Sequence, residues 1–171
     1  MSELKLCGMA LIFGTSVWTG FGAAARVRKT AAQLDQLRRS LEIMRCEIAC
    51  RLTPIRKLCR MLSEACTGEL SRFYARMGER LQQGDSVVNA AAEARRVCRG
   101  LLLPPQIALT MDELFSSFGS YDYEAQLRLI DLAAERTAAA QKRLEEGKRD
   151  RCRSYEILGI CAGIAIVILV A

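Results

Sequence analysis

The sequence predicts an all-α protein, an antiparallel bundle of about six helices flanked by an N-terminal and a C-terminal transmembrane helix. Three observations support this prediction. Both ends of the chain are uncharged and apolar, the region between them repeats apolar side chains every three or four positions, and the 171 residues include only three prolines. That repeat is the period of a helix that buries one face. We therefore divide the chain into residues 1–25, 26–156 and 157–171.

The first segment is uncharged over residues 6–25, which is twenty residues. A helix of that length, rising about 1.5 Å per residue, spans the roughly 30 Å hydrocarbon core of a bilayer. A cleaved signal peptide is the alternative, because Ala23 and Ala25 form a typical cleavage site. The run is longer than the apolar region of most signal peptides, and the cations that follow it oppose export. We expect a transmembrane helix.

The last segment, residues 157–171, is short for a membrane span but is apolar on every side. A buried C-terminal helix is the alternative. A helix on the surface of a domain would keep a polar stripe, and local thinning of the bilayer accommodates a short span. We therefore favour a second transmembrane helix.

Cations border both apolar segments on their inner sides and are scarce on their outer sides. Cytoplasmic flanks of membrane helices carry an excess of Lys and Arg. The pattern predicts a hairpin with both termini outside and residues 26–156 in the cytoplasm. The side chains expected to anchor the spans at the lipid interface are Arg26, Arg28, Lys29, Arg151, Arg153 and Tyr155.

Small residues recur four positions apart in both predicted spans, at Ala10 and Gly14 and at Gly159 and Gly163. This spacing lets two helices approach closely. It predicts packing between the spans, or between subunits of a homo-oligomer. The usual enrichment of glycine in membrane helices explains the same pattern, and both interpretations stay open.

The middle region contains six stretches with helical apolar spacing, separated by connections short enough to make neighbouring helices antiparallel. Thr53 is expected to cap a helix whose first turn holds Pro54. Gly84 is expected to end one helix and Asp85 to cap the next. The stretches are 34–48, 55–65, 70–81, 87–98, 107–118 and 127–144, and the other boundary residues are Gly100, Pro104, Pro105, Gly119 and Asp122.

The last of these helices is expected to run from Asp122 into the membrane without a break. Gly147 lies inside it. A hinge is one interpretation of this glycine. The favoured one is a tolerated residue that costs about 1 kcal/mol against alanine.

The chain has eight cysteines, no histidine and no Cys-x-x-Cys pair. The spacing of Cys46, Cys50, Cys59 and Cys66 matches no zinc site. A cytoplasmic domain is in a reducing compartment, which disfavours disulfides. We expect reduced, buried cysteines that act as small apolar residues, with no metal or other cofactor.

Catalytic chemistry is not predicted. The absence of histidine excludes triads and proton shuttles that use an imidazole, and no glycine-rich phosphate loop occurs. The cations lie mainly where anionic lipid explains them. They are not interleaved with the aromatics that a single-strand nucleic-acid binder uses, so nucleic acid is not an expected partner. The sequence predicts a scaffold.

Several short strings follow one another in a recognisable order. Residues 5–8 precede the apolar run that ends in residues 19–21. Glu47 and Ile48 are followed by residues 53–55, and residues 118–120 by Asp122 and Gln126. Residues 153–155 then precede Leu158, Gly159 and Gly163. In this order the chain resembles the stage III sporulation protein AB family of endospore-forming bacteria.

The chain departs from that family at two places. Cys50 stands where the family has tyrosine. Thr30 and Ala31 replace an arginine-proline pair ahead of Gln33, where the family's first cytoplasmic helix begins.

The resemblance implies a platform in the complex that joins mother cell and forespore, on the mother-cell side of the forespore envelope. It implies a cytoplasmic bundle similar to the type II secretion F platform protein. The implied partners are a cytoplasmic ATPase of the stage III sporulation protein AA type, other membrane proteins of the channel and the lipid bilayer. The residues implied in partner binding or assembly are Glu47, Thr53, Pro54, Asp122 and Gln126, for which helix capping and internal pairing are the alternative roles.

Two other functions are alternatives. A membrane-anchored signalling or sensor adaptor fits a long helix that leaves a span, but the chain has no phosphoacceptor histidine. An exported helical protein fits only if the first apolar segment is a cleaved leader.

Overall fold

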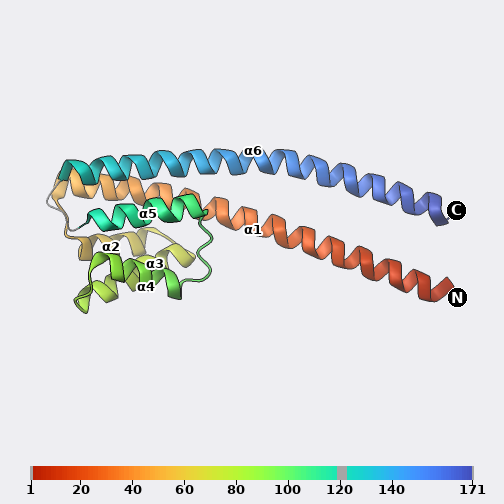
Figure 1. Ribbon diagram of the computed structural model, residues 1–171, viewed down its shortest axis with the longest axis horizontal. Helices are drawn as coiled ribbons and strands as arrows, with labels where there is room; N and C mark the ends of the chain where they lie inside the picture. The colour runs from red at the N-terminus through yellow and green to blue at the C-terminus, as the bar shows by residue number, and fades with distance from the viewer. Residues whose placement is uncertain (1, 119–122, 171) are drawn as a thin grey trace.

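The computed structural model describes the backbone of residues 2–118 and 123–170, and the side chains of residues 25–118 and 123–147. Within those ranges it contains six helices and no strand, which confirms the predicted helical bundle. Two long helices come first and last in the chain, and the four short ones that lie between them in the sequence pack along one stretch of the long pair (Figure 1). The helices are α1 (Ser2–Arg51), α2 (Ile55–Ala65), α3 (Gly68–Gln82), α4 (Val87–Val97), α5 (Pro105–Ser117) and α6 (Tyr123–Val170).

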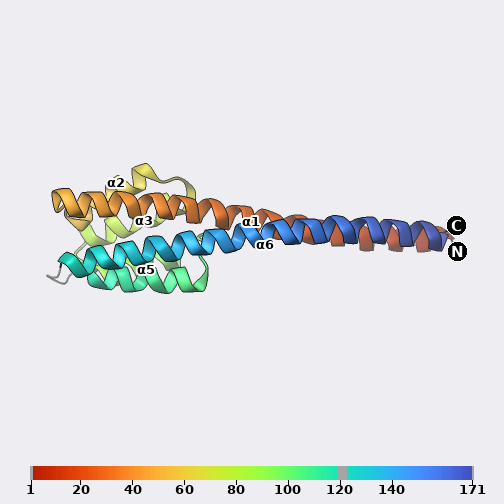
Figure 2. The same cartoon turned by 90° about the horizontal axis from the view of Figure 1, so that it is seen from above.

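The two long helices lie side by side and run antiparallel (Figures 1 and 2). Both continue past the short helices to the same end of the molecule, where the two chain termini lie. Helix α5 packs on α6, α3 packs on both α2 and α4, and α4 also touches α5. We use "far end" for the end of the bundle opposite the termini, where α1 ends and α2 and α6 begin.

The core is built from the apolar stripes that the sequence predicts. Helix α1 contributes a buried row at three- and four-residue spacing, and α3 and α5 contribute aromatic rings. The ring centroids of Phe73 and Phe115 lie 5.9 Å apart, and Phe73 meets Tyr74 edge to face at 5.4 Å. Each fully buried leucine contributes about 1.5–3 kcal/mol of burial free energy. The buried row of α1 is Leu34, Leu37, Leu41, Met44 and Ile48.

Helix α1 is continuous from Ser2 to Arg51, so the expectation that a bundle helix begins at Gln33 is wrong. Thr30 and Ala31 both keep the backbone donor that a proline lacks, so neither interrupts the helix here. Helix α6 is likewise continuous through Gly147, as predicted.

Two predicted caps are also wrong. Thr53 does not cap α2, because Pro54 occupies the N-cap position with ψ 141° and the Thr53 side chain is bound elsewhere. Asp85 does not cap α4, because it pairs with Arg80 at 2.6 Å. Ser86 caps that helix instead, and its hydroxyl accepts a hydrogen bond from the amide of Asn89.

The other predicted boundaries that fall in the described part of the chain lie at the ends of helices or between them. Gly84 follows the end of α3 with φ +95°, a conformation that glycine adopts without strain. Pro104 and Pro105 open α5, and Gly100 lies in the connection after α4. Gly119 and Asp122 lie outside the described residues.

Residues 6–24 and 157–171, which hold the predicted spans, lie outside the residues whose side chains are described. Among the residues that were searched, 25–118 and 123–147, no helix is long and apolar enough to cross a membrane. Arg26, Arg28 and Lys29 are exposed on α1. The side chains of Ala10, Gly14, Arg151, Arg153, Tyr155, Gly159 and Gly163 are outside the described ranges.

Candidate docking surface at the far end of the bundle

Glu47 stabilises the connection between α1 and α2. Its side chain is only 10% exposed. One carboxylate oxygen accepts a hydrogen bond from the Thr53 hydroxyl at 2.8 Å, and the other pairs with the Arg51 guanidinium at 3.1 Å. The backbone amide of Thr53 also donates to the carbonyl of Glu47 at 3.3 Å. The path of the chain around this corner is therefore fixed from both sides of Leu52.

Leu52 occupies an unusual position within that corner. Its φ is +48°, in the left-handed region, and its side chain is 72% exposed. An L-residue with a side chain pays about 1–2 kcal/mol to adopt this conformation. Burial does not offset that cost here, because the side chain faces solvent.

Exposed cations surround this leucine in the sequence. The chain has no acidic residue between Glu47 and Glu64 but has four cations there, Arg51, Arg56, Lys57 and Arg60. The last three are exposed on α2, and nothing in the described structure forms an ion pair or hydrogen bond with their side chains. Arg56 and Lys57 lie in the first turn of α2, where the helix dipole disfavours positive charge.

We call residues 49–60 the α1–α2 corner. Besides Leu52 and the cations, it exposes Ala49, Cys50 and Pro54. The corner therefore exposes apolar side chains and cations within one short stretch of the chain. Such a surface can bind an acidic partner and has no acid–base pair with which to do chemistry.

The sequence-predicted residues Glu47, Thr53 and Pro54 meet at this corner. Gln126 lies at the far end on another helix, where its amide donates to the carbonyl of Ser117 at 3.3 Å and joins α6 to the end of α5. Asp122 lies outside the described residues. These contacts secure connections of the bundle, and the expected roles of the same residues in partner binding stay predictions.

The role of Leu52 could not be predicted from the sequence. A leucine carries no signal of positive φ, since glycine and asparagine are the usual residues there. The strongest signal in the sequence was the stretch between Glu47 and Glu64, which holds four cations and no acidic residue.

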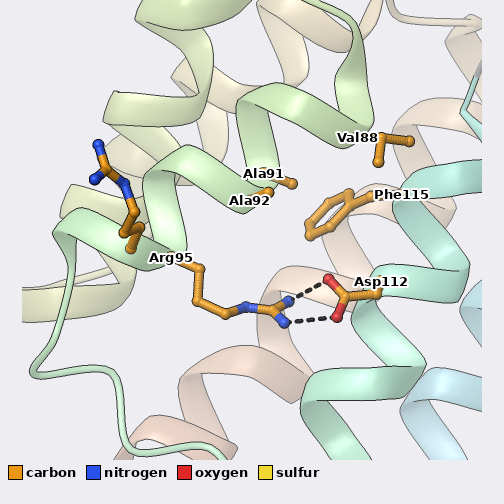
Figure 3. A pocket seen from close by; sticks show the side chains of 7 residues that line it. Val88, Ala91, Ala92, Arg95, Asp112 and Phe115 are labelled. Carbon is orange, nitrogen blue, oxygen red and sulfur yellow. Dashed lines mark hydrogen bonds and ion pairs between the residues drawn. The ribbon is translucent and has the colours of Figure 1, made fainter.

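A groove of about 430 Å³ lies between α4 and α5 (Figure 3). Val88, Ala92 and Phe115 make it mostly apolar. At its edge the Arg95 guanidinium meets both carboxylate oxygens of Asp112 at 2.6 Å. Arg96 beside it pairs with Glu93 at 3.0 Å. The two guanidinium groups of this groove are thus paired with acids of the chain, whereas Arg56, Lys57 and Arg60 at the α1–α2 corner have no such pair in the described structure.

The cysteines divide into two groups. Cys59, Cys66 and Cys98 are buried free thiols, as predicted, and burial raises the pKa of Cys59 to about 12 and that of Cys66 to about 11. Cys46 and Cys50 are exposed, so the prediction that they are buried is wrong. No cluster of three or more metal-ligating side chains occurs within residues 25–118 and 123–147.

Comparisons with known proteins identify the family. The family model described as stage III sporulation protein AB matches residues 5–171. Stage III sporulation protein AB of Bacillus subtilis (strain 168) is 24% identical over 168 residues, which covers 97% of this chain and 98% of that protein. A solved structure of stage III sporulation protein AB shares the fold, with a TM-score of 0.65 at 20% identity, over 71% of this chain and 98% of the other.

Proposed function

The chain belongs to the stage III sporulation protein AB family, and from that premise we propose that it is a non-enzymatic membrane platform of the channel between mother cell and forespore. In this proposal residues 1–25 and 157–171 span the membrane. Residues 26–156 extend into the mother-cell cytoplasm, where they bind a secretion-type ATPase. Other membrane proteins of the channel surround the spans.

One observation supports this proposal above the others. Helices α1 and α6 run antiparallel and leave the bundle toward the same end (Figure 1). The two apolar ends of the chain are therefore positioned to enter one bilayer together, with the bundle on a single side. The exposed cations Arg26, Arg28 and Lys29 lie where α1 would leave the lipid.

The continuity of the long helices gives the platform a mechanical role. Neither α1 nor α6 has a break between the bundle and its terminal segment. From Lys29 to Arg51 a helix rises about 33 Å, so the far end stands well away from the membrane surface. A force applied there by a partner would reach the spans through two unbroken helices.

The proposal is tested with the full chain in lipid nanodiscs and the stage III sporulation protein AA-type ATPase of the same host. We expect the ATPase to be retained by nanodiscs that hold the chain and not by empty ones. Equal recovery of the ATPase on both would contradict the docking role. The chain alone should show no nucleotide hydrolysis, and hydrolysis by it would contradict the non-enzymatic part.

A further inference from the structure

We propose that the α1–α2 corner is the surface that receives the ATPase, and that Leu52 enters an apolar socket within an acidic face of that partner. This inference rests on the proposed function, because it takes the docked protein to be the ATPase. The observation behind it is a strained, exposed leucine near three exposed cations, Arg56, Lys57 and Arg60, whose side chains have no ion pair among residues 25–118 and 123–147.

Leu52 is held in its conformation by its neighbours in the sequence. Glu47 binds residues on both sides of it and so holds the backbone in the left-handed conformation. A glycine would adopt that φ without strain. The leucine side chain contributes nothing to the core, since it is 72% exposed. We therefore expect this side chain to act in contacts with a binding partner.

The cations on α2 differ from many other cations of the bundle in having no ion pair in the described structure. Several arginines elsewhere on the bundle pair with acids of the same chain, as Arg76 does with Glu79 at 2.8 Å and Arg95 with Asp112 at 2.6 Å. The side chains of Arg56, Lys57 and Arg60 have no such partner among the described residues. An acidic protein surface complements them, and bringing opposite charges together also speeds association.

Neither a lipid surface nor single-stranded nucleic acid fits the α1–α2 corner. The corner lies at the far end, about 33 Å along α1 from Lys29, beyond the roughly 8 Å range over which lipid charge acts at physiological salt. The corner also has no aromatic residue, and single-stranded nucleic acid is bound by aromatic stacking. An acidic protein with an apolar socket is the occupant that fits both the leucine and the cations.

The test measures binding of the ATPase to the full chain in nanodiscs of uncharged lipid. Leu52→Gly removes the side chain and relieves the backbone strain, so the thermal unfolding midpoint should stay equal or rise. The dissociation constant should nevertheless increase about tenfold or more, because an anchoring leucine is lost. Leu109→Ala is the matched control, since Leu109 is 63% exposed on α5, and it should leave affinity unchanged.

Charge reversal provides the second arm. Arg56→Glu combined with Lys57→Glu should weaken binding at least tenfold and reduce its dependence on salt. Arg99→Glu is the control, because Arg99 is exposed in the connection between α4 and α5 at the opposite end of the bundle. Wild-type affinity in the Arg99 variant would support the corner.

The outcomes separate the two proposals. No binding by the wild-type chain would overturn both the docking function and this surface. Binding that survives Leu52→Gly and the double charge reversal would overturn the surface and leave the docking function standing. Equal loss of affinity in the Leu109 and Arg99 controls would also overturn the surface, because the effect would then not be specific to the corner.

Discussion

The hydroxyl groups of Ser40 and Tyr74 lie 2.8 Å apart in the core, where they join α1 to α3. Both side chains are fully buried. The Ser40 hydroxyl donates a hydrogen bond to the carbonyl of Leu37 at 2.7 Å. Tyr74 is therefore the donor in the hydrogen bond between the two hydroxyls. Burial raises the pKa of Tyr74 above its usual value, which keeps the phenol protonated for this role.

This geometry predicts an asymmetric pair of substitutions. Tyr74→Phe removes a donor, while Ser40 keeps its bond to Leu37, so we expect a loss of about 1 kcal/mol in unfolding free energy. Ser40→Ala leaves a buried phenol without an acceptor and should cost more, about 2–3 kcal/mol. Urea unfolding of the purified full chain measures both values.

The double variant is the control for that pair. With Ser40→Ala in place, adding Tyr74→Phe should recover part of the lost stability, because the unpaired hydroxyl is then gone. A double variant as unstable as the sum of the two single variants would contradict the assigned bond.

Gln33 predicts a local effect at the other end of the bundle. Its buried amide donates to the carbonyl of Gly100 at 2.9 Å and accepts from the amide of Leu102 at 2.6 Å. Gln33→Leu removes both bonds and should cost about 1–3 kcal/mol. Hydrogen exchange should accelerate at Leu102 while the amides of α3 stay protected. Unchanged exchange at Leu102 would show that the amide does not hold this connection.

Two glycines should respond in opposite directions to alanine. Gly84→Ala places a side chain at φ +95° and should destabilise the bundle by about 1 kcal/mol. Gly147→Ala lies in a continuous helix with open space around it and should stabilise by up to about 1 kcal/mol. Thermal unfolding measures both. Sporulation lost in a stable Gly147→Ala strain would instead favour the hinge interpretation.

The sequence was a good guide where one physical signal dominates. The rows of Leu34 to Ile48 and Leu70 to Leu81 could be assigned because a buried helical face needs only the right period. Gly84 could be assigned because few residues other than glycine adopt its φ easily. The opening of α5 at Pro105 followed from the backbone restrictions of proline.

The misses occurred where two local signals competed or where tertiary contacts decided. Thr53 suits an N-cap, but the buried carboxylate of Glu47 binds its hydroxyl. Asp85 and Ser86 are both suitable N-cap residues. Asp85 forms an ion pair with Arg80, and Ser86 caps the helix. The exposure of Cys46 and the conformation of Leu52 depend on which faces the other helices cover, which a single sequence does not reveal.

The cysteines predict a graded chemical reactivity. At pH 8 an alkylating reagent should modify the exposed Cys46 and Cys50 far faster than the buried Cys59 and Cys66. Because burial raises the pKa of these two buried thiols to about 12 and about 11, the neutral form is favoured in the fold. Their contribution to stability is present below about pH 9 and is lost as the pH rises toward 11 and 12.

Peptide-resolved mass spectrometry follows the modification, and urea unfolding between pH 8 and 11 follows the stability. Cys59→Ala should flatten the decline in stability with pH across this range. Equal alkylation rates for Cys46 and Cys59 in the folded chain would contradict the burial assigned here.

The proposed platform role is tested most directly by finding on which side of the membrane the bundle is exposed. Cys46 and Cys50 are natural reporters for it, because both are exposed on the bundle. A membrane-impermeant thiol reagent is added to intact protoplasts that express the chain, and modification is read at each cysteine. The account predicts that Cys46 and Cys50 stay unmodified until the protoplasts are lysed and then react fully, whereas their modification in intact protoplasts would contradict it.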